Sequence, residues 1–446
     1  MKFVSTSNPR LETSLTEAVS GCIAPDGGLL LPASIPKLPG AFFNNIAELS
    51  LKEIAYVIAT SFFGDDIPPH ILKDITDRAF GCGIPLVAPG GGDAPRVLEL
   101  FHGPTLTVKD FGAMFMAGII LRLNPTADQE NDGWKVLLAS SGNSAVAIGS
   151  AFRSIRGADF YVVCPHGSVR RRRHSILSSF GSNVHIIEAG GDIDQCNGIV
   201  RTCIADERAA GFTKVCGANS VNIARLIPAV VFFFHAYSRL RSELGQPEAD
   251  RAVYSVPCGN LTALTAAVIA RRMGLPMGKI VAAQTVTDAL GAFLRNDASP
   301  SGSHSRLATS MNADCPTSLP RLVSLCGGRD GIAREIDTVV VSDSEIEQTM
   351  RGTLGKHRYS LSPHSAVAFA AAGKFTGTGV PVVALATAHP AVDIDVFTAV
   401  TGAPVELPHQ LTRLMNTKLL PVIRMAPTVP ALRKLVRGAL HPSKKL

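Results

Sequence analysis

Apolar and polar positions follow two alternating periods through the middle of the chain. Short apolar runs such as Lys135–Ala139 and Phe160–Cys164 are followed by longer stretches such as Ser144–Ile155, where apolar residues recur at helical spacing. Short apolar runs predict buried strands, and the longer period predicts helices. Strands separated by helices of this length predict βαβ units with a mostly parallel sheet, which is the α/β fold class.

The same alternation continues to residue 386. The longest apolar stretch, Leu226–Phe234, contains Pro228 and is too short to span a bilayer, so we expect a buried helix there. Pro89–Asp93 and Ala298–Ser310 are rich in small and turn-forming residues and are predicted to be mobile surface. Further strands are predicted at 184–188, 252–256, 280–283 and 382–386, and further helices at 193–210 and 262–273.

Polar turns follow directly after several of these predicted strands. Ser140–Ser144 and Cys258–Thr262 each lie between a strand and a helix. The carboxyl ends of parallel strands meet at one edge of a sheet, where ligands bind, and the free N–H groups of a helix start favour a phosphate or carboxylate. An ordinary capped turn has the same pattern, so the two loops are more informative together than separately.

Lys109 lies where another helix is predicted to begin. Apolar residues recur at helical spacing through Met114–Leu123, and Thr107 is the predicted N-cap, which places Lys109 in the first turn. The positive end of the helix dipole disfavours an ammonium group and suits a neutral, nucleophilic amine. A surface lysine that reaches into water fits the same position, and the position alone favours that plainer interpretation.

Composition and charge narrow the class of protein. The 446 residues are too many for one simple core and predict two or three packed lobes. The net charge of +7 suits anionic small molecules, and the dense basic run Arg170–His174 has no interleaved aromatic residues, so no nucleic-acid partner is expected. The N-terminus lacks the apolar core of a signal peptide, so we expect a cytoplasmic protein without a membrane partner.

Metal and disulfide chemistry find little support in the sequence. The nine cysteines are scattered and form no C-x-x-C pair, which predicts reduced thiols and neither a zinc site nor a disulfide framework. His102, His364 and His389 stand near loops without metal-ligand spacing, so we expect structural roles for them and no bound metal. The usual signatures of nucleotide phosphate loops, serine hydrolases and zinc proteases are missing.

Segments spread over nearly the whole chain resemble those of one enzyme family. The lysine segment and the later Thr387–Ala391 segment, in this order, are a specific signal, and the set resembles the threonine synthases, which use pyridoxal 5'-phosphate (PLP). The segments are Ala24–Leu29 (APDGGL), Phe101–Leu106 (FHGPTL), Lys109–Ala113 (KDFGA), Asn219–Leu226 (NSVNIARL), Val256–Asn260 (VPCGN), Pro363–Ala368 (PHSAVA), Thr387–Ala391 (TAHPA) and Ala431–Leu435 (ALRKL).

The resemblance implies fold type II of the PLP enzymes, similar to the tryptophan synthase β subunit. In that fold, two α/β lobes with mostly parallel sheets hold the cofactor between them. The implied division is an N-terminal threonine-synthase-like segment at 1–95, a smaller lobe with the PLP lysine at 96–250, and a larger lobe at 251–446. The larger lobe would carry the loop that cradles the cofactor phosphate and a C-terminal helical tail.

The resemblance also assigns roles to individual residues. Lys109 would bind PLP covalently and shuttle protons at the substrate, Asn143 would lie against the cofactor ring, and Thr387 would donate a hydrogen bond to the ring nitrogen. The cofactor phosphate would be held by Gly259, Asn260, Leu261 and Thr262. The substrate carboxylate would be held by Ser141, Gly142, Asn143 and Ser144. The basic run itself adds a further prediction: Arg170–Arg173 follow a strand-end loop, so one of them, taken here as Arg170, is expected to hold the substrate phosphate in place of a lysine that the family has. A solvated helix face fits the same run equally well.

The implied reaction converts O-phosphohomoserine and water into threonine and phosphate, and the implied partner is a small, phosphorylated amino acid. The ligand loops depart from the family pattern. Ser141–Ala145 reads SGNSA where the family has SGDTG, and Gly259–Ala263 reads GNLTA where it has GNFGD. Ser362 stands in place of an aspartate, and Val392 in place of a lysine.

These departures keep a second hypothesis open. It is a diverged PLP-dependent enzyme that eliminates or replaces a group on another activated amino acid. A third hypothesis, a non-enzymatic relative that keeps the fold, is disfavoured by Lys109 and Thr387. The expected assembly is a monomer or a homodimer.

Overall fold

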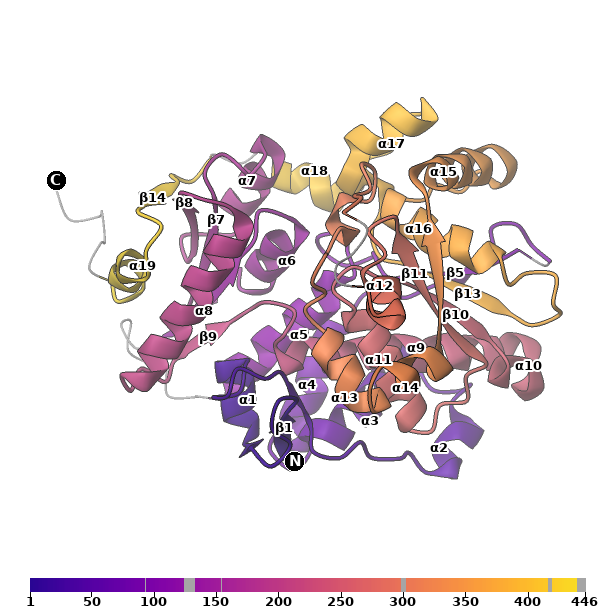
Figure 1. The fold of residues 1–446 in the computed structure, drawn as a ribbon, viewed down its shortest axis with the longest axis horizontal. Coiled ribbons are helices and arrows are strands. Elements are labelled where there is room, and N and C mark those ends of the chain that lie inside the picture. Colours follow the sequence, from indigo (N-terminus) through magenta and orange to yellow (C-terminus); the bar gives the residue numbers. More distant parts are fainter. Residues whose placement is uncertain (93, 124–132, 154, 298–301, 416–418, 439–446) are drawn as a thin grey trace.

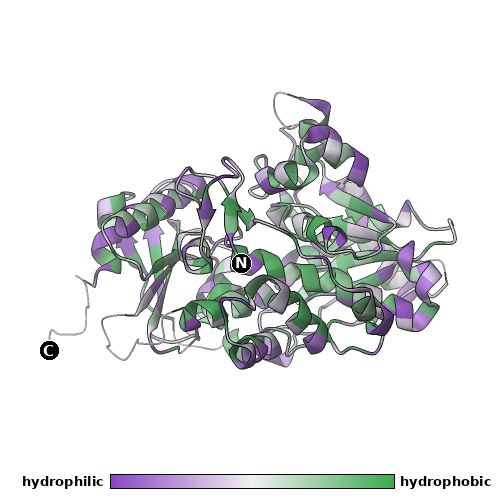
Figure 2. Ribbon diagram, turned by 90° about the horizontal axis from the view of Figure 1, so that it is seen from below, coloured by the Kyte–Doolittle hydropathy of each residue, from purple (hydrophilic) through white to green (hydrophobic). Residues whose placement is uncertain are grey.

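The computed structural model describes residues 1–92, 94–123, 133–153, 155–297, 302–415 and 419–438. Two α/β lobes lie side by side, with long helices between them and the N-terminal segment along one side (Figure 1). Apolar residues concentrate in the strands and in the helices between the lobes, while the outer helices also carry polar residues (Figure 2). The predicted α/β class with mostly parallel sheets is confirmed.

The larger lobe is built on a six-stranded sheet. Its strands are β4 (Leu86–Val87), β5 (Arg96–Glu99), β10 (Val253–Pro257), β11 (Lys279–Thr285), β12 (Ile336–Val341) and β13 (Val382–Ala386). Their order is β12-β11-β10-β13-β5-β4, and all neighbours are parallel except β4 and β5. The apolar runs predicted as strands at 252–256, 280–283 and 382–386 form the buried centre of this sheet.

The smaller lobe is built on a five-stranded parallel sheet in the order β14-β8-β7-β6-β9. Its three central strands are the ones predicted from the apolar runs near residues 137, 162 and 186. The strands are β6 (Trp134–Ala139), β7 (Ala158–Pro165), β8 (Val184–Ala189), β9 (Val215–Gly217) and β14 (Ile423–Met425).

The N-terminal segment has a small antiparallel sheet and helices that pack on the central helices α5 (Lys109–Arg122) and α9 (Ile223–Leu244). Its strands are β1 (Phe3–Ser5), β2 (Glu12–Thr13) and β3 (Leu30–Pro32), and its helices are α1 (Leu15–Gly21), α2 (Gly40–Asn45), α3 (Leu51–Phe63) and α4 (Pro69–Ala79).

The remaining helices cover the two sheets. Those of the smaller lobe and the C-terminal region are α6 (Asn143–Ala151), α7 (Arg171–Ser178), α8 (Ile193–Ala209), α18 (His409–Met415) and α19 (Val429–Val436). Those of the larger lobe are α10 (Gln246–Asp250), α11 (Thr262–Arg272), α12 (Ala289–Arg295), α13 (Leu319–Cys326), α14 (Arg329–Glu335), α15 (Asp343–His357), α16 (Pro363–Gly373) and α17 (Ile394–Thr401), with the 3-10 turns η1 (Thr309–Met311) and η2 (Pro390–Asp393).

Helix α9 contains the longest apolar stretch and runs through the interior. It is long and apolar enough to cross a membrane by length and composition, yet 94% of its most apolar window is buried inside the protein. Its N-cap residue Asn222 accepts a hydrogen bond from the Ala224 N–H group. The prediction of a buried helix at Leu226–Phe234 is confirmed.

The predicted lobe boundaries assign some strands to the wrong lobe. β5 falls in the range 96–250 but pairs with β13 of the larger lobe. β14 and α19 fall in the range 251–446 but join the smaller lobe, where β14 pairs with β8 and α19 packs on α8. The fully buried Glu207 of α8 holds α19 through Arg433 and Arg437, at 2.6 and 2.8 Å. The chain therefore passes from one lobe to the other more often than a contiguous division of the sequence allows.

The stretch predicted as mobile surface at 298–310 is exposed at most of its described residues but is tied to the larger lobe at two points. Residues 298–301, and Asp93 of the other stretch, lie outside the described residues. Ser305 and Ala308 are buried, so the surface prediction is wrong for this part. The Ser305 hydroxyl donates to Asp343, and the Asn312 side chain donates to the Ser305 carbonyl. The bond from Ser305 joins residues 38 positions apart, and the Ser- and Gly-rich composition of the stretch does not reveal such a contact.

Candidate active site

A cavity of about 450 Å³ lies between the two lobes, where strands of both sheets end. It brings together residues from loops that are far apart in the sequence. Among the residues predicted for the site, it is lined by Lys109, Gly142, Asn143, Ser144, Gly259, Asn260, Thr262 and Thr387. Ser141, Leu261 and Arg170 are not on its wall.

Lys109 begins helix α5, as the sequence predicts. The N-cap is Val108 rather than Thr107, so the predicted cap is wrong by one residue. Thr107 instead pairs with Ala388 in an isolated β-bridge, and the Val108 N–H group donates to the Thr387 carbonyl at 2.8 Å. This pairing keeps residue 107 extended and ties the lysine to the loop after β13.

The environment of Lys109 favours an uncharged amine. Burial, aided by the positive charge of Arg225, lowers the pKa of Lys109 to about 8, although Asp393 and Asp110 oppose the shift. A lysine with such a pKa exists partly as the free amine near neutrality. The amine can therefore react with a carbonyl group and can exchange protons with a bound molecule.

Asp110 supports the turn that delivers Lys109. Its carboxylate accepts hydrogen bonds from the Thr105 hydroxyl and the Thr105 N–H group, at 2.6 and 2.9 Å. A Cβ atom on Gly103 would lie 2.4 Å from an Asp110 oxygen, so glycine is required there for the close approach. Burial raises the pKa of Asp110 to about 6. The KDFGA segment thus places Lys109 in the cavity and Asp110 in the buried turn behind it.

Three helix starts at the cavity lack side-chain caps. The N-cap residues of α5, α6 and α11 are Val108, Gly142 and Leu261, and none of them makes a side-chain capping bond. By contrast α1, α3, α8 and α15 each begin with a complete capping box. Uncapped N–H groups at a helix start bind anions well. The three starts together form a region suited to phosphate and carboxylate groups.

The turn before α11 is held from behind by the larger lobe. A Cβ atom on Gly259 would lie 3.2 Å from both the Ser310 carbonyl oxygen and the Met311 Cα, so glycine lets η1 pass close to the turn. Leu261 has a φ of +63°, a left-handed conformation that is strained for a leucine. Asn260 accepts a hydrogen bond from the Thr262 N–H group at 3.1 Å.

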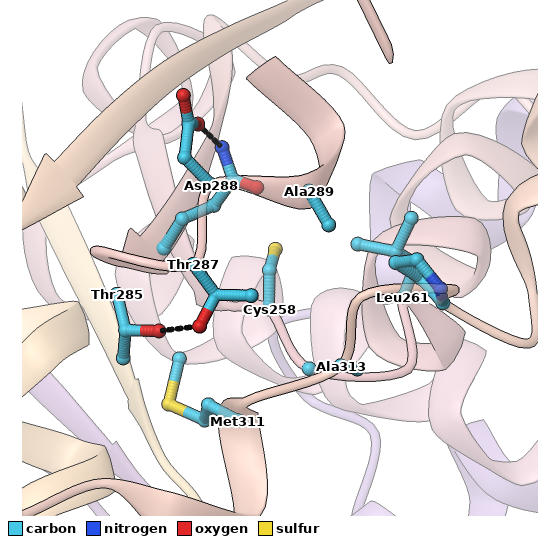
Figure 3. Close-up of a pocket in the computed structure, with 11 residues that line it drawn as sticks. Cys258, Leu261, Thr285, Thr287, Asp288, Ala289, Met311 and Ala313 are labelled. Atoms are coloured by element: carbon cyan, nitrogen blue, oxygen red, sulfur yellow. Dashed lines mark hydrogen bonds between the residues drawn. The ribbon is translucent and has the colours of Figure 1, made fainter. Parts of the chain in front are cut away.

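A second, smaller pocket lies behind this turn and is lined by Cys258, Leu261, Thr287 and Met311 (Figure 3). Its volume is about 10 Å³, room for roughly one water molecule. The Thr285 and Thr287 hydroxyls are hydrogen-bonded beside it. The Leu261 side chain therefore packs into the support of the turn, and any contact of Leu261 with a ligand would come from its backbone.

The arginine cluster presents Arg173 to the cavity. Arg173 lines the wall, and its guanidinium donates to the Asn143 side chain at 3.4 Å. Arg172 crosses to the other lobe and donates to the Ala391 carbonyl at 2.8 Å. The sequence prediction chose Arg170, which lines only the adjoining outer cavity; its side chain is 76% exposed and lies 3.9 Å from Asp395. Helix α7 begins at Arg171, so Arg170 lies at its outer end.

A further cavity of about 300 Å³ adjoins the first one. It shares Asn143, Arg173 and Asp393 with the larger cavity and extends along α7 toward Val392. The cationic wall formed by α7 therefore continues outward from the region of Lys109. A ligand with an anionic arm has room to extend in this direction.

Sequence interpretation missed several residues of the cavity wall. Arg225 lies in the first turn of α9, donates to the Ala218 carbonyl at 2.9 Å, and has no acidic partner among the described residues. Burial lowers the pKa of Arg225 to about 10. Ser310, His364 and Asp393 also line the cavity. The match at Asn219–Leu226 was the available signal for Arg225, whereas His364 was assigned a structural role.

Comparisons with known proteins show the family of this chain. A family model described as pyridoxal-phosphate dependent enzyme matches residues 97–387, and one described as threonine synthase N terminus matches residues 2–80. Threonine synthase from Escherichia coli is 30% identical over 421 residues, which are 94% of this chain and 96% of that relative. The chain belongs to the threonine synthase family.

Solved structures of this family share the fold. Threonine synthase from Escherichia coli matches with a TM-score of 0.87 at 29% identity, covering 99% of this chain and 100% of that one. PLP-bound threonine synthase from Brucella melitensis matches with a TM-score of 0.86 at 28% identity, covering 100% of both chains. The predicted fold type II is confirmed, and the chain is a PLP-dependent enzyme.

The residues present fit PLP. The Lys109 amine, with its lowered pKa, suits covalent attachment of the cofactor aldehyde. The uncapped start of α11 suits the cofactor phosphate. The Thr387 hydroxyl lines the cavity and makes no hydrogen bond to any residue that the structure describes, so it is available to a ligand.

Proposed function

We propose that this protein is a threonine synthase, which converts O-phosphohomoserine and water into threonine and phosphate in the cytoplasm. The observation that carries the proposal is one cavity in which an amine of lowered pKa, Lys109, lies between uncapped helix starts and a cationic wall. A doubly charged amino-acid phosphate needs an anion site at each of its ends, and the PLP cofactor needs a third for its own phosphate.

Bound PLP supplies a conjugated ring that stabilises negative charge on the substrate carbons. Lys109 would move the protons on carbon: it would take them from Cα and Cβ and return them to Cγ, where a methyl group forms after phosphate leaves, and to Cα. A pKa of about 8 suits both uptake and release. The Thr387 hydroxyl would donate to the ring nitrogen and, unlike a carboxylate partner, would leave that nitrogen largely unprotonated. The resulting weaker electron sink suits elimination chemistry.

Separate parts of the wall bind the two ends of the substrate. The start of α6, with Asn143 and Ser144, holds the substrate carboxylate through its free N–H groups. Arg173 holds the substrate phosphate, because a guanidinium binds phosphate with two parallel hydrogen bonds. This arginine supplies the cation that the family has as a lysine at the position of Val392, which lines the same outer cavity.

The test compares the amounts of threonine and phosphate formed. Purified enzyme loaded with PLP is mixed with O-phosphohomoserine, and phosphate and threonine are measured in the same samples. Equal amounts of the two products are expected, and Lys109→Ala serves as the inactive control. Release of phosphate without threonine would contradict the proposal and favour a diverged elimination enzyme, as would a lack of any reaction with this substrate.

A further inference from the structure

Ser310, His364 and Asp393 form a row of polar side chains on the cavity wall. The Ser310 Oγ lies 2.6 Å from His364 Nε2, and His364 Nδ1 lies 3.3 Å from Asp393 Oδ2. They come from η1, the first turn of α16, and η2, so only the tertiary structure brings them together. All three line the cavity that contains Lys109.

The inner two groups are withdrawn from solvent. The side chains of His364 and Asp393 are 9% and 18% exposed. Among the described residues neither His364 Nδ1 nor Asp393 Oδ2 has a hydrogen-bond partner, so each faces the other across an ion-pair contact only. Burial alone would raise the pKa of Asp393, but the contact with His364 and the positive charges of Arg173 and Lys109 lower it. The carboxylate is therefore ionised and faces the imidazole.

The charge on Asp393 selects one tautomer of His364. A carboxylate beside Nδ1 favours a proton on that nitrogen and leaves Nε2 as an acceptor. The Ser310 hydroxyl then donates to Nε2, and its oxygen lone pairs remain free toward the cavity, where the residue is exposed. In this orientation Ser310 can accept a proton from a molecule in the cavity and pass its own proton to His364.

Stabilisation of α16 does not account for the row. That helix is already capped by Ser362, whose hydroxyl accepts from the Ser365 N–H group. The opposite end of the row reaches η1, which packs against Gly259 of the turn before α11. The row thus joins the three loops around the cavity, with its only exposed hydroxyl on the cavity side.

We propose that Ser310, His364 and Asp393 form a proton relay that activates the water added to the substrate, an inference that rests on the proposed function. An O–H bond of water breaks as the oxygen bonds Cβ of the unsaturated substrate. The water proton passes to Ser310 Oγ while the serine proton passes to His364 Nε2. The electron pair of the Cα–Cβ double bond shifts to Cα, where Lys109 delivers a proton.

The relay returns to its starting state within the same turnover. Asp393 stabilises the imidazolium, which gives its proton back through Ser310 to the expelled phosphate, and hydrogen phosphate carries the proton away. Lys109 handles only the carbon-bound protons, so expulsion of phosphate does not depend on the relay. A variant without the relay should therefore still release phosphate but form little threonine.

The experiment measures phosphate, threonine and 2-oxobutyrate made from O-phosphohomoserine by PLP-loaded Ser310→Ala, His364→Gln and Asp393→Asn. We expect each variant to keep releasing phosphate while the threonine made per phosphate falls at least about tenfold. The substrate that loses phosphate without becoming threonine should appear as 2-oxobutyrate, because the unsaturated product is hydrolysed in water. His102→Gln is the matched control, since the His102 side chain is 41% exposed, contacts Glu99 and does not line the cavity.

A second readout follows the imidazole itself. In ¹⁵N-histidine-labelled protein, with and without PLP, the signal lost in His364→Gln should show the Nδ1-protonated tautomer and should change in Asp393→Asn. Variants that make threonine and phosphate in the parental ratio, even at lower rates, would overturn the relay, as would an Nε2-protonated tautomer. If the parent released phosphate without threonine, the proposed function would fail, and the water step would fall with it. Ser310→Ala removes one exposed oxygen, so it keeps the test valid should His364→Gln not fold.

Discussion

The two walls of the cavity are built in different ways. On the larger lobe, backbone bonds hold in place the loops proposed to bind the cofactor, beside the side-chain row of Ser310, His364 and Asp393. The Thr387 carbonyl accepts from Val108, and the Asn260 carbonyl accepts from Ser318, at 2.8 and 3.0 Å. On the smaller lobe, long side chains make the corresponding contacts, with Arg173 reaching Asn143 and Arg172 crossing to η2.

The difference indicates that one wall binds the cofactor and the other selects the substrate. A wall fixed by backbone bonds changes little when side chains are replaced, which suits a cofactor that every turnover needs in one position. A wall of long cationic side chains depends on the residue types present, which suits selection among anionic substrates. Substitutions on the two walls should therefore fail in different ways.

The largest effect is expected at the junction of the walls. Lys109→Ala should lower kcat by roughly thousandfold or more, because it removes both the cofactor attachment and the proton carrier. The melting temperature should change little. Lys279→Ala, at an exposed lysine paired with Asp337, is the control. After borohydride reduction the cofactor should be found on the peptide that contains Lys109, and finding it on another lysine would contradict the assignment.

The pH dependence of cofactor capture gives the next largest effect. Only the uncharged Lys109 amine reacts with the PLP aldehyde, and burial lowers its pKa to about 8. Below pH 8 the uncharged fraction, and with it the rate of PLP capture by the cofactor-free protein, should fall about tenfold per pH unit. Stopped-flow absorbance should show a plateau above pH 8. A rate that keeps rising to pH 10 would mean that the lysine has an ordinary pKa.

Arg173→Ala should lower kcat/KM for O-phosphohomoserine at least about tenfold, equivalent to about 1.4 kcal/mol. PLP binding should be unchanged, because the proposed site of the cofactor phosphate, the start of α11, is on the other wall. Arg201→Ala is the control, because Arg201 is an exposed arginine on α8 that lines neither cavity, and parental kinetics are expected for it. Equal effects of the two substitutions, or a loss of PLP affinity in Arg173→Ala, would remove the distinction between the walls.

Thr387→Val should have the smallest effect, a loss of several-fold in kcat with the fold intact, because one hydrogen bond to the ring nitrogen is removed. Its side chain has nearly the same shape, and the backbone bond to Val108 remains. Thr387→Asp should protonate the ring and increase side reactions such as transamination. Steady-state rates and the cofactor absorption spectrum test both, and parental behaviour of Thr387→Val would show that the hydroxyl has no part in binding the ring.

The order of strands and helices was accessible from the sequence, because hydrophobic periodicity reports local burial. The predicted strands near residues 137, 162, 254 and 384 form the centres of the two sheets, and Lys109 does begin a helix. Family segments identified the cofactor, because a lysine that binds PLP must stand in a specific local turn. Each of these features depends on residues that are close neighbours along the chain.

The walls of the cavity were decided by the tertiary structure. Periodicity could not distinguish Arg173 from Arg170, since the choice depends on where α7 begins and on how the lobes face each other. Ser310 lay in a stretch predicted as mobile surface, and His364 was expected to be structural, yet both line the cavity. Such contacts join loops of different strands, and their energies depend on sheet order and lobe packing, which no local pattern encodes.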